Sequence, residues 1–407
     1  MTKKHTKKNH KNKIKSYKIN NTQKNTWKKI MNKNCRYINN KQNLKRNKLL
    51  KKIALEEAFT WPTQKEDMNE KYPLEFVINS GNGNNKYNRL LDITDGLREK
   101  EMDKNNVIIQ VLSPTAPGLE NLKIKTIEGQ VKKAIEVNNY LYNKIKNKPT
   151  KFKGFASLPM RDPLKASLEL DRCIKELGMV GALVNGPDII YKNNKKEMLF
   201  YDTPEYDILW KKFEELDVPL YIHPAVYESL DTHEDKTLIH FYKEYPELVG
   251  SAWGFTIYLA QQIMRIMISG VFDRFPKLKI IIGHMGELLP WMAERFDHRL
   301  CVYKKELTQL SKQEFKKNGL SEFKIPKLTL SEYLKRNIYI TTSGWFSDDA
   351  LLHVINKVGI DRVMFSIDYP YEEQSVASEW LENIPLSFGD KEKIAYKNAA
   401  KLLKLNI

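Results

Sequence analysis

The sequence predicts an α/β protein in which eight parallel strands close into a (β/α)8 TIM barrel, preceded by a basic extension. From residue 53 onward, short apolar runs alternate with longer amphipathic stretches, there are eight such runs, and no GxGxxG follows any of them. Alternation of strands and helices is typical of a parallel sheet. Eight units favour a closed barrel, because open doubly wound sheets usually have about five or six strands.

The candidate strands are short, nearly continuous apolar runs that end in Gly, Pro or polar residues, as strands buried on both faces do. They span residues 53–59, 107–113, 152–159, 180–186, 219–224, 279–285, 337–344 and 363–368. Helical periodicity fills most of the gaps, over residues 127–146, 163–177, 204–216, 257–275, 348–358 and 391–405.

Two stretches fall outside this pattern. Residues 60–87 are charged and rich in Gly and Asn, and residues 300–325 are rich in Lys. Loops that follow strands lie on the catalytic face of a barrel, so the first stretch is placed to cover a site there.

The net charge of +18 belongs to the N-terminal extension rather than to the barrel. Residues 1–52 contain 17 Lys, 2 Arg and 11 Asn, with no Asp or Glu. Subtracting these 19 from the 68 basic residues leaves 49, against 50 acidic residues. We therefore divide the chain into a disordered extension, residues 1–50, and a barrel domain, residues 51–407. A solvated extension is the simplest interpretation; a targeting segment, or contact with nucleic acid or anionic lipid through charge alone, remain alternatives.

Several classes of protein are excluded. No 18-residue apolar run is present, so no membrane span is expected, and the N-terminus lacks the apolar segment of a signal peptide. The three cysteines show no metal-ligand spacing, which favours reduced thiols in a cytoplasmic protein.

Residues able to do chemistry gather at the predicted strand ends, where barrel enzymes place their catalytic groups. Glu56 and Glu57 lie on the first strand, His223 ends the fifth, His284 the sixth and Asp368 the eighth. Alternation sends only one of the two glutamates inward. We predict that Glu56, His223 and Asp368 hold one divalent metal, because two carboxylates and an imidazole leave positions open for water and substrate.

His284 lies in the segment Gly-His-Met-Gly-Glu, where Glu287 follows three residues later. A carboxylate at this spacing can orient or charge the imidazole. A tight strand-to-helix turn, with Glu287 at the helix N-terminus, would explain the same sequence without a catalytic role. We favour a functional pair of His284 and Glu287 that assists proton transfer.

With these residues in view, the chain resembles the amidohydrolase-related decarboxylases, most closely the fungal-type 2,3-dihydroxybenzoate decarboxylases. The resemblance covers residues 52 to about 405, and the basic extension has no counterpart in it. The matching segments are KIALEEAF (52–59), VLSPTAPG (111–118), GALVNG (181–186), VPLYIHP (218–224), residues 269–299 with GHMGE, IYITTSGWFS (338–347), FSIDYPYE (365–372) and NAAKLLKL (398–405).

The resemblance implies a distorted (β/α)8 barrel and assigns roles residue by residue. Glu56, His223 and Asp368 match the family's metal ligands, and His284 and Glu287 match its proton-transfer pair. Barrels of this kind form homo-dimers or homo-tetramers, which is the expectation here.

Two positions depart from the wider superfamily. Ala58 stands where many members have a second ligand on the first strand, which removes a nitrogen donor and favours Mg²⁺ or Mn²⁺ over Zn²⁺. Trp345 stands where a smaller polar residue is expected, which bears on the aromatic substrate rather than on the reaction.

The function implied is non-oxidative decarboxylation of an ortho-hydroxybenzoate such as 2,3-dihydroxybenzoate, a small aromatic carboxylic acid, with release of CO2 and a catechol or phenol. Asp368 is the expected proton donor. Phe59, Tyr371 and Arg299 are candidates for substrate binding; barrel packing explains the two aromatic residues equally well, and a position on a surface helix explains Arg299 better. One alternative is a hydrolase that opens a lactone or amide with metal-bound water. Another is a non-catalytic barrel whose basic extension contacts nucleic acid or membrane.

Overall fold

Eight parallel strands form the centre of the structure, which is a computed structural model. The structure describes residues 49–64, 86–94, 96–120, 122–192, 195–225, 245, 248, 250–307, 312–317 and 326–407. Residues 49–407 form one compact unit. The predicted extension lies outside the described residues except at Leu49 and Leu50, so its disorder stays a prediction.

The strands belong to two parallel sheets that continue into one another. One has the order β1-β2-β3 and the other the order β10-β9-β8-β7-β4. Their bounds are β1 Lys52–Phe59, β2 Val107–Pro114, β3 Phe152–Gly154, β4 Ala182–Asn185, β7 Leu220–His223, β8 Ile280–Ile282, β9 Ile338–Thr341 and β10 Val363–Met364. An isolated parallel bridge between Ala156 and Ala182 joins the end of β3 to β4.

The ring closes between β1 and β10 through single hydrogen bonds. The Glu56 N–H donates to Ser366 Oγ at 2.7 Å, and the Ala58 N–H donates to the Tyr369 carbonyl at 2.7 Å. The strands therefore follow one another around the ring in chain order, and the predicted barrel is confirmed. The β1–β10 seam is its weakly paired, distorted side.

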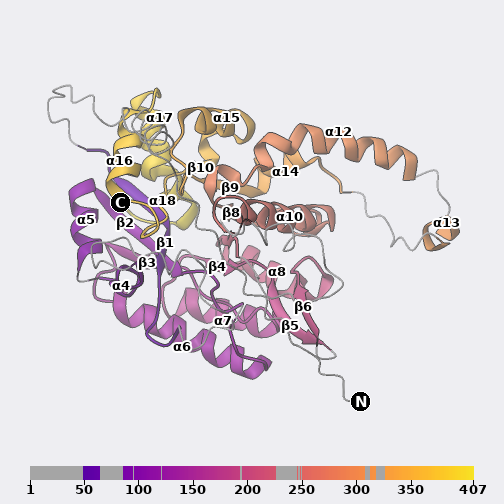
Figure 1. Cartoon of the computed structure of the whole chain (residues 1–407), viewed down its shortest axis with the longest axis horizontal. Coiled ribbons are helices and arrows are strands. Elements are labelled where there is room, and N and C mark those ends of the chain that lie inside the picture. Colours follow the sequence, from indigo (N-terminus) through magenta and orange to yellow (C-terminus); the bar gives the residue numbers. More distant parts are fainter. Residues whose placement is uncertain are drawn as a thin grey trace, which may run out of the picture. The chain divides into compact units, whose positions relative to one another are not determined.

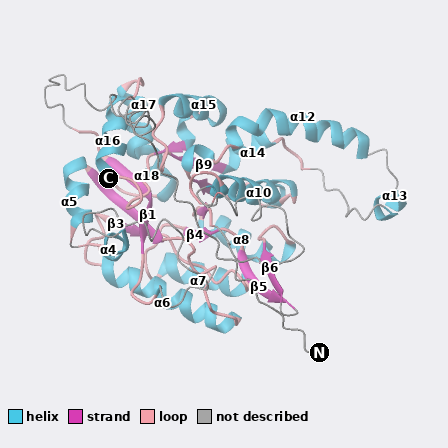
Figure 2. Ribbon diagram, in the orientation of Figure 1, coloured by secondary structure: helices cyan, strands magenta, loops and turns pink. Residues whose placement is uncertain are grey.

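Helices cover the outside of the strands (Figures 1 and 2). Those that match predicted stretches are α6 (Ile127–Ile145), α7 (Pro163–Lys175), α8 (Asp207–Leu216) and α15 (Asp348–Val358). Further helices are α4 (Lys86–Leu91), α5 (Leu97–Asn105), α13 (Lys312–Lys317), α14 (Leu330–Asn337) and α16 (Gln374–Asn383). Helix starts follow local chemistry: Thr126, Asp162 and Ser347 each accept a backbone N–H at the first turn of α6, α7 and α15.

Several predicted stretches differ in detail. The stretch 257–275 is two helices, α10 (Gly254–Ile268) and α11 (Val271–Arg274), because Gly270 adopts a left-handed φ of 78° between them. The stretch 391–405 is α17 (Phe388–Glu392), a π-helical turn (Lys393–Lys397) and α18 (Asn398–Leu403). The long helix α12 (Leu289–Leu307, orange in Figure 1) enters the predicted excursion 300–325. An antiparallel hairpin, β5 (Asp188–Lys192) with β6 (Lys195–Leu199), was not predicted.

Two apolar layers hold the domain together. Ile53, Leu55, Val111, Ile281 and Met364 belong to a cluster inside the barrel, which residues of α18 also join. The larger cluster packs the outer faces of the strands against the helices. Strands of a closed barrel are buried on both faces in this way, which explains their continuous apolar sequences. Among the described residues, no helix is long and apolar enough to cross a bilayer.

Candidate active site

A pocket at the carboxyl ends of the strands contains most of the predicted chemistry. Among the described residues it is lined by Glu56, Ala58, Lys86, Ser113, Pro114, Thr115, Ala116, Leu183, Asn185, His223, Ser251, Phe255, His284, Asp368, Tyr371 and Glu372. These come from at least four strand ends, as expected for a barrel enzyme.

An irregularity in β1 decides which of the paired glutamates faces the pocket. The register between β1 and β2 shifts between Ala54 and Glu57. Leu55 lies in the barrel's inner cluster, so strict alternation would turn Glu56 outward. The shift instead leaves Glu56 facing the pocket, as β-bulges near active sites commonly re-aim a side chain.

The second glutamate closes the β1–β10 seam. The Glu57 carboxylate accepts the Ile367 N–H at 3.0 Å and the Ser366 hydroxyl at 3.1 Å. Burial raises the pKa of Glu57 to about 8, although these hydrogen bonds and Arg98 oppose the rise. Glu57 therefore has a structural position next to the metal-binding candidate.

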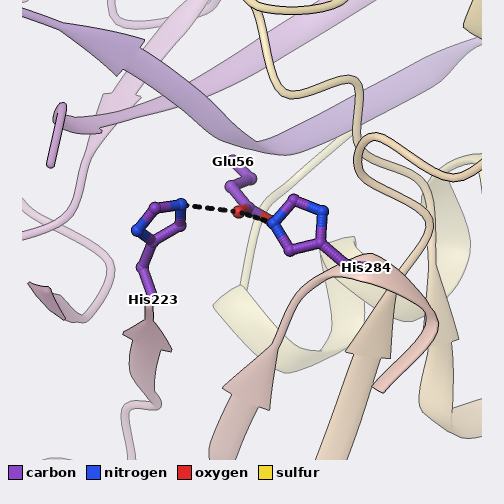
Figure 3. A group of neighbouring side chains, drawn as sticks. All are labelled: Glu56, His223 and His284. Atoms are coloured by element: carbon purple, nitrogen blue, oxygen red, sulfur yellow. Dashed lines mark ion pairs between the residues drawn. The ribbon is translucent and has the colours of Figure 1, made fainter. Parts of the chain in front are cut away.

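Glu56 is buried between two imidazoles, as Figure 3 shows. Its Oε1 lies 3.3 Å from His223 Nε2 and 3.2 Å from His284 Nε2. Burial by itself raises the pKa of Glu56, but His284, His223 and the Ser343 hydroxyl outweigh it and bring that pKa to about 2. The carboxylate is therefore ionised across the physiological range.

A group of hydroxyls holds the other oxygen of this carboxylate. Tyr221 and Ser343 donate hydrogen bonds to Glu56 Oε2, and Thr341 does so at 3.4 Å. Thr341 is also 2.8 Å from the Tyr221 hydroxyl and 2.9 Å from that of Ser343. None of these three hydroxyl residues is among the predicted site residues. The sequence does indicate Tyr221, because it precedes His223 by two residues and so shares its face of β7.

His284 is oriented by a hydrogen bond to the backbone. Its Nδ1 lies 2.9 Å from the carbonyl oxygen of Ser343. Because a carbonyl only accepts, we infer that Nδ1 carries a proton, which leaves Nε2 to face Glu56 Oε1. Metal-binding histidines are commonly fixed in this way.

The backbone around His284 and Asp368 is unusual. His284, Met285, Glu287, Leu288 and Asp368 all have positive φ, between 48° and 78°. Non-glycine residues rarely adopt this conformation, and such strain gathers at functional sites.

Glu56, His223 and His284 form a group of donors suited to a metal ion. One ligand atom from each lies within 4.8 Å of the other two. Glu56 Oε1 and His284 Nε2 are buried and have no hydrogen-bond partner among the described residues, although they face each other. Two nitrogens and an oxygen that converge on one point fit a divalent cation between them.

This group differs from the predicted ligand set at one position. His284, predicted for proton transfer, supplies the third donor, whereas the Asp368 carboxylate is not part of the group. The set is therefore richer in nitrogen than the sequence suggested. Ala58 lines the pocket, as its predicted place beside the metal requires, and offers no donor.

Asp368 nevertheless lies in the same pocket and acts electrostatically on the group. Burial, with the neighbouring Glu56 carboxylate, raises the pKa of Asp368 well above its usual range, while His284 opposes the rise. Gly344, with a φ of 63°, lets both side chains approach its backbone: a Cβ there would lie 3.0 Å from His284 Nδ1 and 3.4 Å from Asp368 Oδ2. Asp368 as a metal ligand stays a prediction.

The predicted pair of His284 and Glu287 is present, with 3.9 Å between Nε2 and Oε1. Burial raises the pKa of Glu287, and His284 opposes this. Burial lowers the pKa of His284, but Glu56, Glu287 and Asp368 raise it well above its usual range. The role of the pair in proton transfer stays a prediction.

The three candidate substrate-binding residues have different positions. Tyr371 lines the pocket, where its hydroxyl is hydrogen-bonded to Thr115. Phe59 is buried and stacks on Tyr140 of α6, at 6.4 Å between ring centres, outside the lining described above. Arg299 is an exposed residue of α12 that lies over the Tyr303 ring. The structure therefore brings only Tyr371 to the pocket.

Trp345 also lies away from the described lining of the pocket. It is partly exposed and stacks on Trp291, with 5.4 Å between ring centres and 10° between planes. The expectation that it bears on the substrate finds no support in this position.

Gly283 should be required for full metal affinity. A Cβ at this position would lie 2.5 Å from Glu56 Oε2 and 3.0 Å from Ser343 Oγ. We expect Gly283→Ala to displace the carboxylate and weaken Mn²⁺ binding by roughly 10- to 100-fold, the usual effect of disturbing the residues around a ligand. Isothermal titration calorimetry measures this affinity. Gly389→Ala is the matched control, since a Cβ there meets nothing within 4 Å; equal affinities in the two variants would contradict the argument.

Comparison with known proteins identifies the family. A family model described as amidohydrolase matches residues 89–405. The chain belongs to the amidohydrolase family. It is 38% identical over 318 residues to a gamma-resorcylate decarboxylase of Polaromonas sp., a match that covers 78% of this chain and 89% of the relative.

Solved structures of decarboxylases share the fold. A dihydroxybenzoic acid decarboxylase from Polaromonas sp., with bound manganese and the inhibitor 2-nitroresorcinol, superimposes with a TM-score of 0.74 at 36% identity, covering 88% of this chain and 98% of that one. A 2,6-dihydroxybenzoate decarboxylase complexed with 2,6-dihydroxybenzoate gives a TM-score of 0.74 at 34% identity, covering 88% and 100%.

This chain is therefore a decarboxylase, a carboxy-lyase of the amidohydrolase superfamily. The predicted family is confirmed at that level. The finer resemblance to 2,3-dihydroxybenzoate decarboxylases is not supported, because the relatives described above that name an isomer are named for the 2,6-isomer.

Proposed function

We propose that this enzyme decarboxylates 2,6-dihydroxybenzoate without an oxidant, giving resorcinol and CO2. The observation that carries the proposal is the group of Glu56, His223 and His284 beside Asp368 in one pocket. The relatives named for this substrate and the manganese in one of them support it.

The three donors would hold one divalent cation, and the manganese bound in a solved relative favours Mn²⁺. When bound, the cation would neutralise the negative charge of the substrate's carboxylate and neighbouring phenolate oxygens. The hydroxyls of Tyr221, Thr341 and Ser343 keep the Glu56 carboxylate in place for this task.

Asp368 is the proposed proton donor. Its carboxyl gives a proton to the ring carbon that bears the carboxylate, which interrupts the aromatic system. The bond to the carboxylate carbon then breaks, its electron pair restores the aromatic ring, and CO2 leaves. Asp368 regains a proton from water, so the net reaction consumes one proton for each carboxylate lost.

The walls of the pocket suit a flat ring. Leu183, Phe255 and Pro114 supply apolar surface, whereas Asn185 and Ser113 supply polar groups for ring hydroxyls. A mostly apolar pocket with a few convergent polar groups is typical of sites for small ligands.

The experiment that tests this proposal compares substrates under identical conditions. Mn²⁺-loaded protein is incubated with 2,6-dihydroxybenzoate, 2,3-dihydroxybenzoate and a simple lactone, and products are separated by liquid chromatography. We expect resorcinol from the first at a rate that exceeds catechol release from the second. Faster catechol release would assign the enzyme to the 2,3-isomer, and lactone opening without CO2 would overturn decarboxylation.

A further inference from the structure

The pocket has an unbalanced set of charges. Three carboxyl side chains line it, those of Glu56, Asp368 and Glu372. Among the described residues of the lining, Lys86 is the only Lys or Arg. The cation proposed above would attract a carboxylate substrate, but the carboxyl groups of the lining have the sign of the substrate, and like charges at short range repel where water is partly excluded.

Lys86 extends into the pocket from α4, which is fastened to the barrel. Arg89 of the same helix pairs with Glu101 and with Glu373, each at 3.0 Å. The Thr60 N–H donates to the Leu90 carbonyl at 3.1 Å, and the Leu90 side chain is fully buried. The second half of this short helix is therefore held against the barrel.

The side chain of Lys86 is also guided at its end. Its Nζ lies 5.2 Å from the centre of the Tyr371 ring, within the range of a cation–π interaction. Tyr371 is fixed in turn by the hydrogen bond of its hydroxyl to Thr115 and by its N–H, which donates to the Asp368 carbonyl at 2.8 Å. The ammonium thus lies over a ring whose backbone is bonded to that of Asp368, the proposed proton donor.

We propose that Lys86 recognises the anionic carboxylate of the substrate and so determines specificity for benzoates over neutral phenols. This inference rests on the proposed function. The ammonium offers a charge-assisted hydrogen bond to the anion and offsets the repulsion of the neighbouring carboxyls. It leaves the neutral product, resorcinol, without such a contact, which favours release of the product after CO2 has left.

The test compares Lys86→Met with the wild-type enzyme. Removing one charge-assisted hydrogen bond should raise KM for 2,6-dihydroxybenzoate by roughly 10- to 100-fold. We expect kcat to stay within about threefold and the inhibition constant of resorcinol to be unchanged, because neither involves the free anion. Lys86→Arg should recover most of the loss, since it restores the charge.

Lys144→Met is the matched control. Lys144 also lies over a tyrosine ring, at 5.6 Å from Tyr140, but on the exposed side of α6. Its loss removes the same charge without touching the pocket, and KM should not change. An unchanged KM in Lys86→Met would overturn the inference. So would an equal loss of affinity for resorcinol, because it would indicate a change in the shape of the pocket.

A binding measurement distinguishes failure of this inference from failure of the proposed function. If the wild-type enzyme fails to release CO2 from 2,6-dihydroxybenzoate, the proposed function fails. Calorimetric titration of the Mn²⁺-loaded proteins with the same anion still measures the role of Lys86: weaker binding to Lys86→Met alone supports it, and equal binding to both proteins refutes it.

Discussion

Replacing Asp368 by Asn is expected to lower kcat for 2,6-dihydroxybenzoate by about 10²–10⁴-fold, the range that a general acid contributes. The amide has nearly the same shape and cannot give up a proton at neutral pH. It also leaves the backbone bonds to this residue intact, including those from the Tyr371 and Glu372 N–H groups to the Asp368 carbonyl. The fold should therefore persist, and a circular dichroism melt checks that it does.

The measurement must separate chemistry from metal binding, because Asp368 faces the donor group. Turnover is followed at Mn²⁺ concentrations shown by titration to saturate both proteins. Asp361→Asn serves as the control, since Asp361 is largely exposed and pairs only with Lys393 among the ion pairs described. If saturated Asp368→Asn turns over at the wild-type rate, Asp368 is not the acid.

The barrel and most of its active site could be predicted because both depend on repeated local patterns. Each strand is an apolar run, and each site residue follows such a run, as His223 follows LYI and His284 follows IIIG. Closure of the ring then brings the ends of the first and eighth strands together, so Glu56 and Asp368 share a pocket. The number of strands and their order in the chain are enough to place these two residues together.

The presence of His284 in the donor group, in the place predicted for Asp368, could not be predicted in the same way. It depends on the left-handed φ of His284 and on the Ser343 carbonyl, which turn Nε2 towards Glu56. It also depends on the register shift in β1 that aims Glu56 into the pocket. Such shifts break the period-two pattern on which the sequence argument relies.

The substrate-binding candidates show the same limit. Residue type and nearness in sequence to motif residues favour Phe59 and Arg299 as substrate contacts. Phe59 instead packs on Tyr140, and Arg299 lies on an exposed face of α12. The sequence does not single out Lys86, because its helix begins inside a stretch without periodicity, and only its position beside Tyr371 identifies it.

Removal of the metal should abolish decarboxylation and destabilise the protein at the same time. Glu56, His223 and His284 converge on one point with their ligand atoms within 4.8 Å, an arrangement that a cation between them stabilises. Dialysis against a chelator is expected to remove turnover, and Mn²⁺ should restore it. When free Mn²⁺ is 100 times its Kd, binding adds about 2.7 kcal/mol to the free energy of unfolding. Differential scanning calorimetry detects this as a rise in Tm.

Glu56→Gln tests whether this group is the site. The amide keeps the shape of the side chain and the hydroxyl contacts on one oxygen, but it removes the negative charge from the atom that faces both imidazoles. We expect Mn²⁺ binding to weaken by more than about 100-fold, beyond what disturbance of surrounding residues causes. Added Mn²⁺ should then leave the Tm of the variant unchanged while still raising that of Glu294→Gln, a control at an exposed ion pair with Lys357. A Tm that rises equally in both variants would place the metal elsewhere, because an ion can stabilise only the state that holds it.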